Sequence, residues 1–371
     1  MEKSTSNSNT PESLQIEVGL SRNAPKKNIS KRVKFLLIFG GVFCAALMIA
    51  AISLIYTLNV FSKELGIKNY PGLISNFINT PFSQILSAGG RTNILVLGKG
   101  GAGHDAPDLT DTVIFVSVAL FASQNPIVLV SLPRDLWIPD IRAKVNSSYY
   151  WGNQKKPGGG LNFAKTEVQE IVGQPIHYAI VIDFSGFKKI IDAIGGIEVN
   201  VERSFVDEHY PIAGREDDPC GGDKLYKCRY ETVRFEKGLK HLDGETALKF
   251  VRSRYAVGDE GTDFARTARQ EKIITAIKKK IFTGEILLNP MRLTGIAKAV
   301  NSSIETDMDQ NVMAIIVRKI IDNKGNVSTN VLLQELLINP PINKKFDNQY
   351  VFVPKAGTWV EVQNWFKKIL Y

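Results

Sequence analysis

Arginines gather in one segment of the chain, FVRSRYAVGDEGTDFARTARQ at residues 250–270. The stretch FVRSR is predicted to form a strand, in which Arg252 and Arg254 lie on the same face because side chains alternate along a strand. Guanidinium groups present fork-shaped sets of donors that match the oxygens of a phosphate. The pair therefore predicts a phosphate or pyrophosphate site, whereas a single arginine would more simply belong to a surface salt bridge.

The second part of the same segment predicts a helix that adds to this site. Thr262 or Asp263 would cap the helix, because both side chains can accept from its free N–H groups. Arg266 would then lie in the first turn, and Gln270 would follow four residues later on the same side. Free N–H groups at a helix N-terminus also favour anions. Two guanidinium groups from a strand would thus converge with one from the start of a helix.

Two further clusters adjoin predicted strands. In LTDT, Asp111 directly precedes a strand, where a carboxylate can bind Mg²⁺ together with a phosphate. The alternative is an aspartate that only caps a turn. In SLPRD, Arg134 follows Pro133, whose fixed φ suits a tight turn. The alternative for this arginine is a surface pair with Asp135.

The segment ILVLGKGGAG, residues 94–103, has the glycine spacing G-x-G-x-x-G of dinucleotide-binding loops. Such a loop requires a helix after the glycines and an acidic residue about 20 positions later. Here HDAPDLTDT follows, in which Pro107 favours a loop instead of a helix. About 20 positions after the glycines, where the acidic residue is required, the chain has Ser123. The pattern therefore does not predict a dinucleotide site. The glycines instead favour close approach of the backbone to a phosphate.

The formal net charge of +9 is concentrated at the N-terminus, where residues 1–34 carry seven basic and three acidic side chains. Residues 35–60 contain no charged side chain and are long enough to span a bilayer. A cleaved signal peptide is the alternative, but its apolar core would be shorter. Because the basic residues precede this segment, the tail should be cytoplasmic and the bulk of the chain extracytoplasmic. That location excludes nucleic acid as a partner.

Short runs rich in Val and Ile predict strands, and amphipathic runs between them predict helices. The predicted strands are 93–97, 112–119, 127–131, 177–183 and 197–201, and the predicted helices are 163–172, 184–194, 242–249 and one that follows residue 262. Residues 203–235 are polar and without periodicity, so they predict a surface excursion. Strands that alternate with helices predict a layered α/β domain.

The chain has three cysteines. Cys44 lies within the apolar segment. Cys220 and Cys228 border the polar stretch CGGDKLYKC in the part predicted to be exported, where an oxidising environment permits a disulfide. Free thiols and a metal site are the alternatives, although zinc would require a second pair of cysteines or matching histidines.

The order of these motifs resembles that of the LytR-CpsA-Psr family of cell-wall ligases. The landmarks, which extend from about residue 91 to about residue 285, are NILVLG, LTDT, SLPRD, KVNSSY, GGIEVNV, GLKHLDGETALKFVRSR and DFARTARQ. The last two are the most specific, and an apolar N-terminal anchor is also expected in this family.

The resemblance implies an αβα sandwich around a mixed central sheet, preceded by one transmembrane helix and held outside the membrane. Members of the family transfer a glycopolymer from a polyprenyl-pyrophosphate carrier to a peptidoglycan hydroxyl, leaving a phosphodiester bond and polyprenyl phosphate. The implied cofactor is Mg²⁺ or Mn²⁺, and the lipid occupies a hydrophobic pocket. The predicted function is therefore that of a phosphotransferase. The alternative is a non-catalytic binding module or regulator for lipid-linked glycan at the cell envelope.

By motif position, the resemblance also assigns roles to individual residues. Asp111 would bind the metal, and Asp263 would act as the base for the acceptor hydroxyl. Arg134 and Arg254 are assigned to catalysis as well as to binding. The residues assigned to the pyrophosphate are Arg134, Lys144, Asn146, Arg252, Arg254, Arg266 and Gln270.

The glycine-rich loop departs from the family pattern. The family usually has a second acidic metal ligand just after its first strand, and Gly100 occupies that position here. We expect the longer loop to bring Asp105 or Asp108 back to the metal, with His104 as a second choice. Otherwise Lys99 would contact the phosphate directly. The remaining alternative is a loop without a ligand role.

The chain is thus predicted to consist of five parts in order. These are a cytoplasmic disordered tail (1–34), a transmembrane helix (35–60), an extracytoplasmic stalk (61–90), a catalytic domain (91–305) and a C-terminal extension packed on that domain (306–371).

Overall fold

The computed structural model describes residues 85–102, 104, 106–287, 289–323 and 326–371. All of them belong to one compact unit of the chain, Tyr56–Tyr371. The predicted cytoplasmic tail, transmembrane helix and most of the stalk lie outside the described residues. Within the described ranges, no helix is long and apolar enough to cross a membrane. The transmembrane helix therefore stays a prediction.

A six-stranded sheet forms the centre of the fold, in the order β11-β6-β1-β2-β3-β12. Its strands are β1 (Arg91–Lys99), β2 (Thr110–Ala119), β3 (Ile127–Leu132), β6 (Tyr178–Asp183), β11 (Ile304–Thr306) and β12 (Val327–Val331). β2 pairs antiparallel with β1 and β3, whereas β6 and β12 pair parallel with β1 and β3. The predicted mixed central sheet is therefore confirmed, and the segment after residue 306 supplies one of its edge strands.

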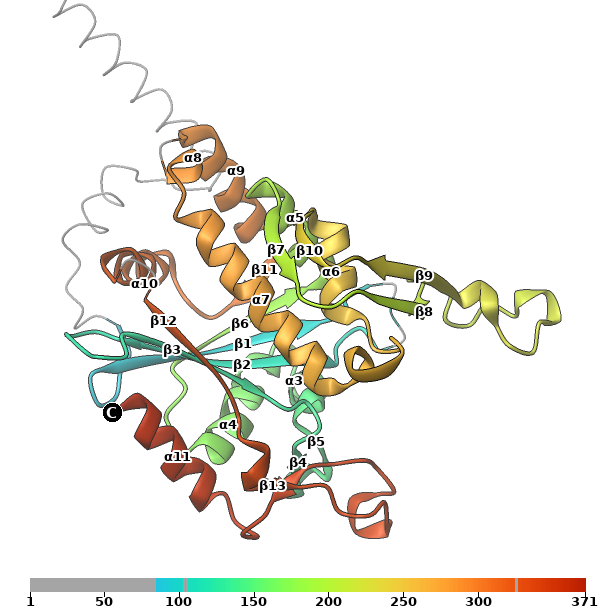
Figure 1. Ribbon diagram of the computed structural model, residues 1–371. Helices are drawn as coiled ribbons and strands as arrows, with labels where there is room; N and C mark the ends of the chain where they lie inside the picture. The colour runs from blue at the N-terminus through green and yellow to red at the C-terminus, as the bar shows by residue number, and fades with distance from the viewer. Residues whose placement is uncertain (1–84, 103, 105, 288, 324–325) are drawn as a thin grey trace, which may run out of the picture. The chain divides into compact units, whose positions relative to one another are not determined.

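Helices cover both faces of this sheet (Figure 1). They are α3 (Ser148–Lys155), α4 (Gly160–Val172) and α11 (Val360–Leu370) on one face, and α7 (Asp263–Ile281) and α10 (Gln310–Asp322) on the other. In β1, Leu95 and Leu97 belong to the core beneath the first layer, and Ile94 and Val96 face the second. One apolar strand serves both layers because its side chains alternate between the two faces.

A second apolar cluster forms beside the sheet. It is built by α5 (Phe184–Ala193), β7 (Ile197–Val201), β10 (Gly238–Leu242), α6 (Gly244–Arg252) and one side of α7. β7 and β10 pair antiparallel, and α5 packs against α6. This cluster holds α6 and α7 together, and the arginine-rich segment runs from one of these helices into the other.

The prediction that FVRSR forms a strand is wrong, because α6 continues through Arg252. Ala247, Phe250 and Val251 recur at helical spacing, and all three pack into the second apolar cluster. Burial of this helical stripe outweighs the preference of valine and phenylalanine for strands.

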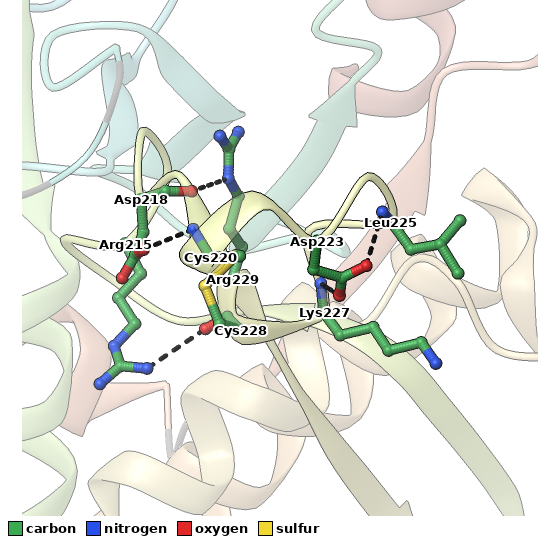
Figure 2. Close-up of a disulfide and its surroundings, with 8 residues drawn as sticks. All are labelled: Arg215, Asp218, Cys220, Asp223, Leu225, Lys227, Cys228 and Arg229. Carbon is green, nitrogen blue, oxygen red and sulfur yellow. Dashed lines mark hydrogen bonds between the residues drawn. A yellow bond between two sulfur atoms is a disulfide. The ribbon is translucent and has the colours of Figure 1, made fainter.

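Residues 203–235, predicted to be a surface excursion without periodicity, include two strands that this prediction missed. They contain an antiparallel hairpin of β8 (Phe205–Pro211) and β9 (Tyr230–Phe235), whose apolar side chains are buried in the second cluster. The polar connection between the strands is closed by a disulfide between Cys220 and Cys228, with the two Cα atoms 5.5 Å apart (Figure 2). This confirms the predicted pairing and excludes the free thiols.

Candidate active site

Asp111 is the second residue of β2 rather than the residue before the strand, and Arg134 follows the end of β3. Because the two strands run antiparallel, with Val113 opposite Leu132, these two positions adjoin. Arg134 Nη1 donates to Asp111 Oδ1, and Arg254 Nη2 donates to Asp111 Oδ2 over 3.4 Å. The carboxylate therefore joins two of the predicted arginines.

The charge of Asp111 is stabilised in this setting. Burial acts to raise the pKa of its carboxyl, but the charges of Arg134, Arg254 and Arg266 outweigh burial and hold the pKa below its usual value. Among the described side chains, the carboxylates of Asp111 and Asp135 face these three guanidinium groups and Lys144, which leaves an excess of positive charge. The surroundings of Asp111 therefore favour a bound anion.

Two cavities of 140 and 80 Å³ adjoin at Asp111, which lines both. Side chains predicted to hold a pyrophosphate line each of them. In the first they are Arg252, Arg254, Arg266 and Gln270, and in the second they are Arg134, Arg266 and Gln270. The predicted convergence is present, although Arg252 reaches it from a helix end and not from a strand.

The start of α7 follows the predicted pattern. Thr262 caps the helix, and its Oγ1 accepts from the N–H of Ala265 over 3.2 Å. Arg266 therefore lies in the first turn, close to the positive end of the helix. Asp263 is the first residue of α7, and its side chain is outside what the structure describes. Its role as a base stays a prediction.

Arg252 is held by aromatic side chains. Its guanidinium carbon lies 4.2 Å from the ring centre of Phe184, and its Nη1 donates to the hydroxyl of Tyr210 over 3.2 Å. Stacking on an aromatic face leaves the edge of a guanidinium group available for further hydrogen bonds. Arg252 and Arg254 thus reach the same cavity through different supports.

Arg269 is a buried arginine that the sequence did not single out. It is 2 % exposed and donates to the carbonyl oxygens of Ser253, over 2.5 Å, and Glu260, over 2.9 Å. These bonds fix both ends of the segment between α6 and α7, which carries Arg254. The repeated arginines of DFARTARQ indicated a basic helix start. They did not indicate which of these arginines is buried.

Lys144 and Asn146 contact the turn that carries Arg134. Lys144 Nζ donates to Asp135 Oδ1 over 2.7 Å, and the N–H of Asn146 donates to the carbonyl of Arg134 over 3.2 Å. Neither is among the described residues that line the two cavities. In this conformation they support the turn that carries Arg134.

The glycine-rich loop brings charged residues together next to the end of β1. Lys99 Nζ donates to Asp108 Oδ1 over 2.8 Å, and it lies 5.0 Å from the ring centre of Tyr149. Burial acts to lower the pKa of Lys99, but the bond to Asp108 and nearby negative charge raise it overall. Asp105 lies outside the described residues. His104 stacks edge-on against Phe184, with the ring centres 5.0 Å apart.

The donor set at Asp111 fits a hard divalent cation. Among the described residues that line the two cavities, the carboxylates are those of Asp111 and Asp135. Mg²⁺ is commonly held by one or two protein carboxylates together with phosphate oxygens and water. Both carboxylates pair with basic side chains, but Asp111 lines both cavities and Asp135 only the second, so Asp111 is the better candidate.

A third cavity, of 430 Å³, lies between the sheet and the helices α7 and α10. Ile274 on α7, Ile316 and Ile320 on α10, and Ile94 and Val116 on the sheet are among the residues that line it. Ile273, Ile277 and Ile281, on the other side of α7, pack into the second cluster. The isoleucines of α7 therefore divide between a core and a cavity wall.

The chain matches the LytR_cpsA_psr family model over residues 73–368. It is 28 % identical over 226 residues to the polyisoprenyl-teichoic acid–peptidoglycan teichoic acid transferase TagU of Bacillus cereus, covering 60 % of this chain and 62 % of that relative. The relative of the same name from Enterococcus faecalis is 29 % identical over 223 residues, covering 58 % and 61 %. The chain thus spans less than two thirds of these relatives.

Two solved structures share the fold. The Lin1025 protein of Listeria innocua has a TM-score of 0.50 and 25 % identity, covering 75 % of this chain and 98 % of that one. The TagV structure from B. subtilis has a TM-score of 0.53 and 22 % identity, covering 76 % and 98 %.

Proposed function

Because the chain belongs to the LytR-CpsA-Psr family, we propose that it transfers a glycopolymer from a polyprenyl-pyrophosphate carrier to peptidoglycan, forming a phosphodiester bond. The observation that carries this proposal is the convergence of Arg134, Arg252, Arg254 and Arg266 on cavities that meet at Asp111. The names of the curated relatives, which are teichoic acid–peptidoglycan transferases, support the same chemistry.

The arginines suit a pyrophosphate because their donors come from different directions. Arg134 and Arg254 already approach one carboxylate from two sides, and Arg266 adds positive charge from a helix start. A phosphate of the donor would take up part of the hydrogen bonding that Asp111 now provides. Phosphoryl transfer depends mainly on such positioning and charge neutralisation.

In the proposed step, the acceptor hydroxyl oxygen attacks the phosphorus that carries the glycan. A new P–O bond forms while the bond from that phosphorus to the bridging oxygen breaks. The bridging oxygen leaves with polyprenyl phosphate, and the hydroxyl proton passes to a base, a role that we propose for Asp263. Arg134 and Arg254 would stabilise charge on the phosphoryl oxygens. When bound at Asp111, Mg²⁺ would neutralise further phosphate charge.

The apolar cavity would hold the polyprenyl chain. Its walls are mainly aliphatic, and at 430 Å³ it is far larger than the two polar cavities. α7 joins the two regions, because Arg266 and Gln270 line the polar cavities and Ile274 lines the apolar one. Residues four apart on a helix share a side, so Gln270 and Ile274 would follow the donor from head group to tail.

We also propose that residues 35–60 anchor the enzyme in the cell membrane, with the catalytic domain outside. The support is their length without a charged residue and the basic tail before them. An anchored enzyme would remain beside a donor that is itself confined to the bilayer.

The proposal is tested with the full-length chain in detergent, a polyprenyl-pyrophosphate disaccharide, Mg²⁺ and a peptidoglycan acceptor. We expect release of polyprenyl phosphate, and a loss of about a hundredfold or more in kcat/KM for Arg254→Ala. Arg203→Ala is the matched control, because Arg203 is exposed and pairs with Asp259 over 2.9 Å, away from both cavities. Tight binding without release would instead indicate the non-catalytic module.

A further inference from the structure

Asp207, on β8, is a fully buried carboxylate whose hydrogen bonds go to the backbone. Its Oδ2 accepts from the N–H groups of Arg254, over 3.0 Å, and Tyr255, over 3.2 Å. Its Oδ1 accepts from the N–H of His209 over 3.0 Å. A buried carboxylate is tolerated where such bonds satisfy it. Asp207 therefore fixes the backbone at Arg254, 47 residues further along the chain.

Tyr210, on the same strand, holds the other arginine of the RSR motif. Its hydroxyl accepts from Arg252 Nη1 over 3.2 Å, and its ring centre lies 5.4 Å from the guanidinium carbon. Burial raises the pKa of Tyr210 to about 12, so the phenol stays neutral at physiological pH. One strand thus contacts both Arg252 and Arg254.

A bulge explains how Asp207 and Tyr210 can both point inward. In a regular strand, residues three apart lie on opposite faces. The β8–β9 pairing, however, shifts register between these two residues. Asp207 and Tyr210 are accordingly buried, whereas Glu208 and His209 between them are exposed. Bulges commonly redirect side chains next to functional sites.

We propose that the bulge of β8 positions the two arginines of the RSR motif, with Asp207 setting the backbone of Arg254 and Tyr210 setting the guanidinium group of Arg252. Asp207 and Tyr210 are positioning residues, because each acts through an arginine. The inference rests on the proposed function for its consequence in turnover, but its structural part can be measured without any activity.

The first test is a double-mutant cycle on the full-length chain. Asp207→Asn keeps the shape of the side chain but replaces one acceptor oxygen by an NH₂ group, which then faces a backbone donor. We expect kcat/KM to fall about tenfold or more in the otherwise native enzyme. In the Arg254→Ala background, Asp207→Asn should lower kcat/KM by less than about threefold, because the arginine side chain through which Asp207 acts is absent. Equal losses in both backgrounds would overturn the positioning role.

The second test measures hydrogen exchange at the backbone and needs no substrate. Asp207→Asn should speed exchange at the amides of Arg254 and Tyr255, while amides of the central sheet keep the wild-type rate. Unchanged exchange at these two amides would overturn the proposal even if turnover fell. If the wild type releases no polyprenyl phosphate, the proposed function fails, and the exchange result alone still decides whether Asp207 holds this segment.

A control and a milder variant guard against misfolding. Asp223 lies in the disulfide-closed loop of the same hairpin and also accepts two backbone N–H groups, from Leu225 over 3.0 Å and Lys227 over 3.2 Å (Figure 2). Asp223→Asn should leave kcat/KM unchanged. Tyr210→Phe removes only a hydroxyl, and we expect it to lower kcat/KM about threefold to tenfold, with no further loss in the Arg252→Ala background. An additive loss of kcat/KM in the Arg252→Ala background would overturn the proposed role of Tyr210.

Discussion

Ile320 lines the apolar cavity from α10, and the next residue, Ile321, is 46 % exposed. We predict that Ile320→Asn weakens binding of farnesyl pyrophosphate and that Ile321→Asn does not. The two variants make the same chemical change one position apart on the same helix. They differ in whether the new amide lies on the cavity wall, so a difference between them reports on the cavity.

The size of the effect follows from the apolar lining. Each methylene group buried by a lipid chain contributes about 0.8 kcal/mol, so one further isoprene unit would contribute up to about 4 kcal/mol if fully buried. Burial of about half of that unit already corresponds to about thirtyfold in affinity. An amide buried against the chain without a partner costs about 1–3 kcal/mol, which would reduce the affinity about fivefold to a hundredfold.

The assay is calorimetry of the full-length chain with geranyl and farnesyl pyrophosphate in one detergent. Ile321→Asn also controls for partition of the ligands into micelles, because that effect is the same for both variants. Wild type and Ile321→Asn should bind the farnesyl compound at least about tenfold more tightly, and Ile320→Asn should lose most of this preference. Equal affinity of the wild type for both chain lengths would refute the assignment of the cavity to the lipid.

Three further predictions concern the head-group site and the hairpin. Asp111→Asn should abolish the increase in pyrophosphate affinity that Mg²⁺ causes, as measured by titration with and without EDTA; an unchanged Mg²⁺ effect would remove Asp111 from the metal site. The pKa of Asp111 is lowered by folding, so its stabilisation is fully present above its ordinary value of 3.8 and is lost as the pH falls through the lowered pKa. The difference in unfolding free energy between wild type and Asp111→Asn should therefore shrink as the pH falls below 3.8, and a constant difference would contradict the lowered pKa of Asp111. Replacing Cys220 and Cys228 by serine should lower the free energy of unfolding by about 2–3 kcal/mol for so short a loop, seen by thermal denaturation, and unchanged stability would show that the loop is ordered without its bond.

The central strands were predictable because their apolar runs are local signals. β1, β2 and β3 follow the predicted segments within a few residues, and the isoleucines of α7 have helical spacing. The prediction for FVRSR was wrong because so short an apolar run fits either period. Only the packing of Phe250 and Val251 against distant residues decides for the helix.

The arginine cluster was predictable in composition but not in its supports. Arg254 and Arg266 reach one cavity, as their spacing around a helix start suggested. The roles of Asp207 and Tyr210 depend on a bulge and on contacts more than 40 residues away in sequence, which no local pattern encodes. Likewise, Arg269 is buried because the segment before α7 folds back over it.

The most direct test of the central claim is to measure both products of one reaction. The full-length enzyme is incubated with a polyprenyl-pyrophosphate glycan, Mg²⁺ and peptidoglycan, and the digested peptidoglycan is analysed by mass spectrometry alongside the released lipid. The account predicts glycan joined to peptidoglycan through a phosphodiester, in an amount equal to the polyprenyl phosphate, with both products lost in Arg254→Ala. Lipid release without the phosphodiester would show a hydrolase, and tight binding with neither product would contradict catalysis altogether.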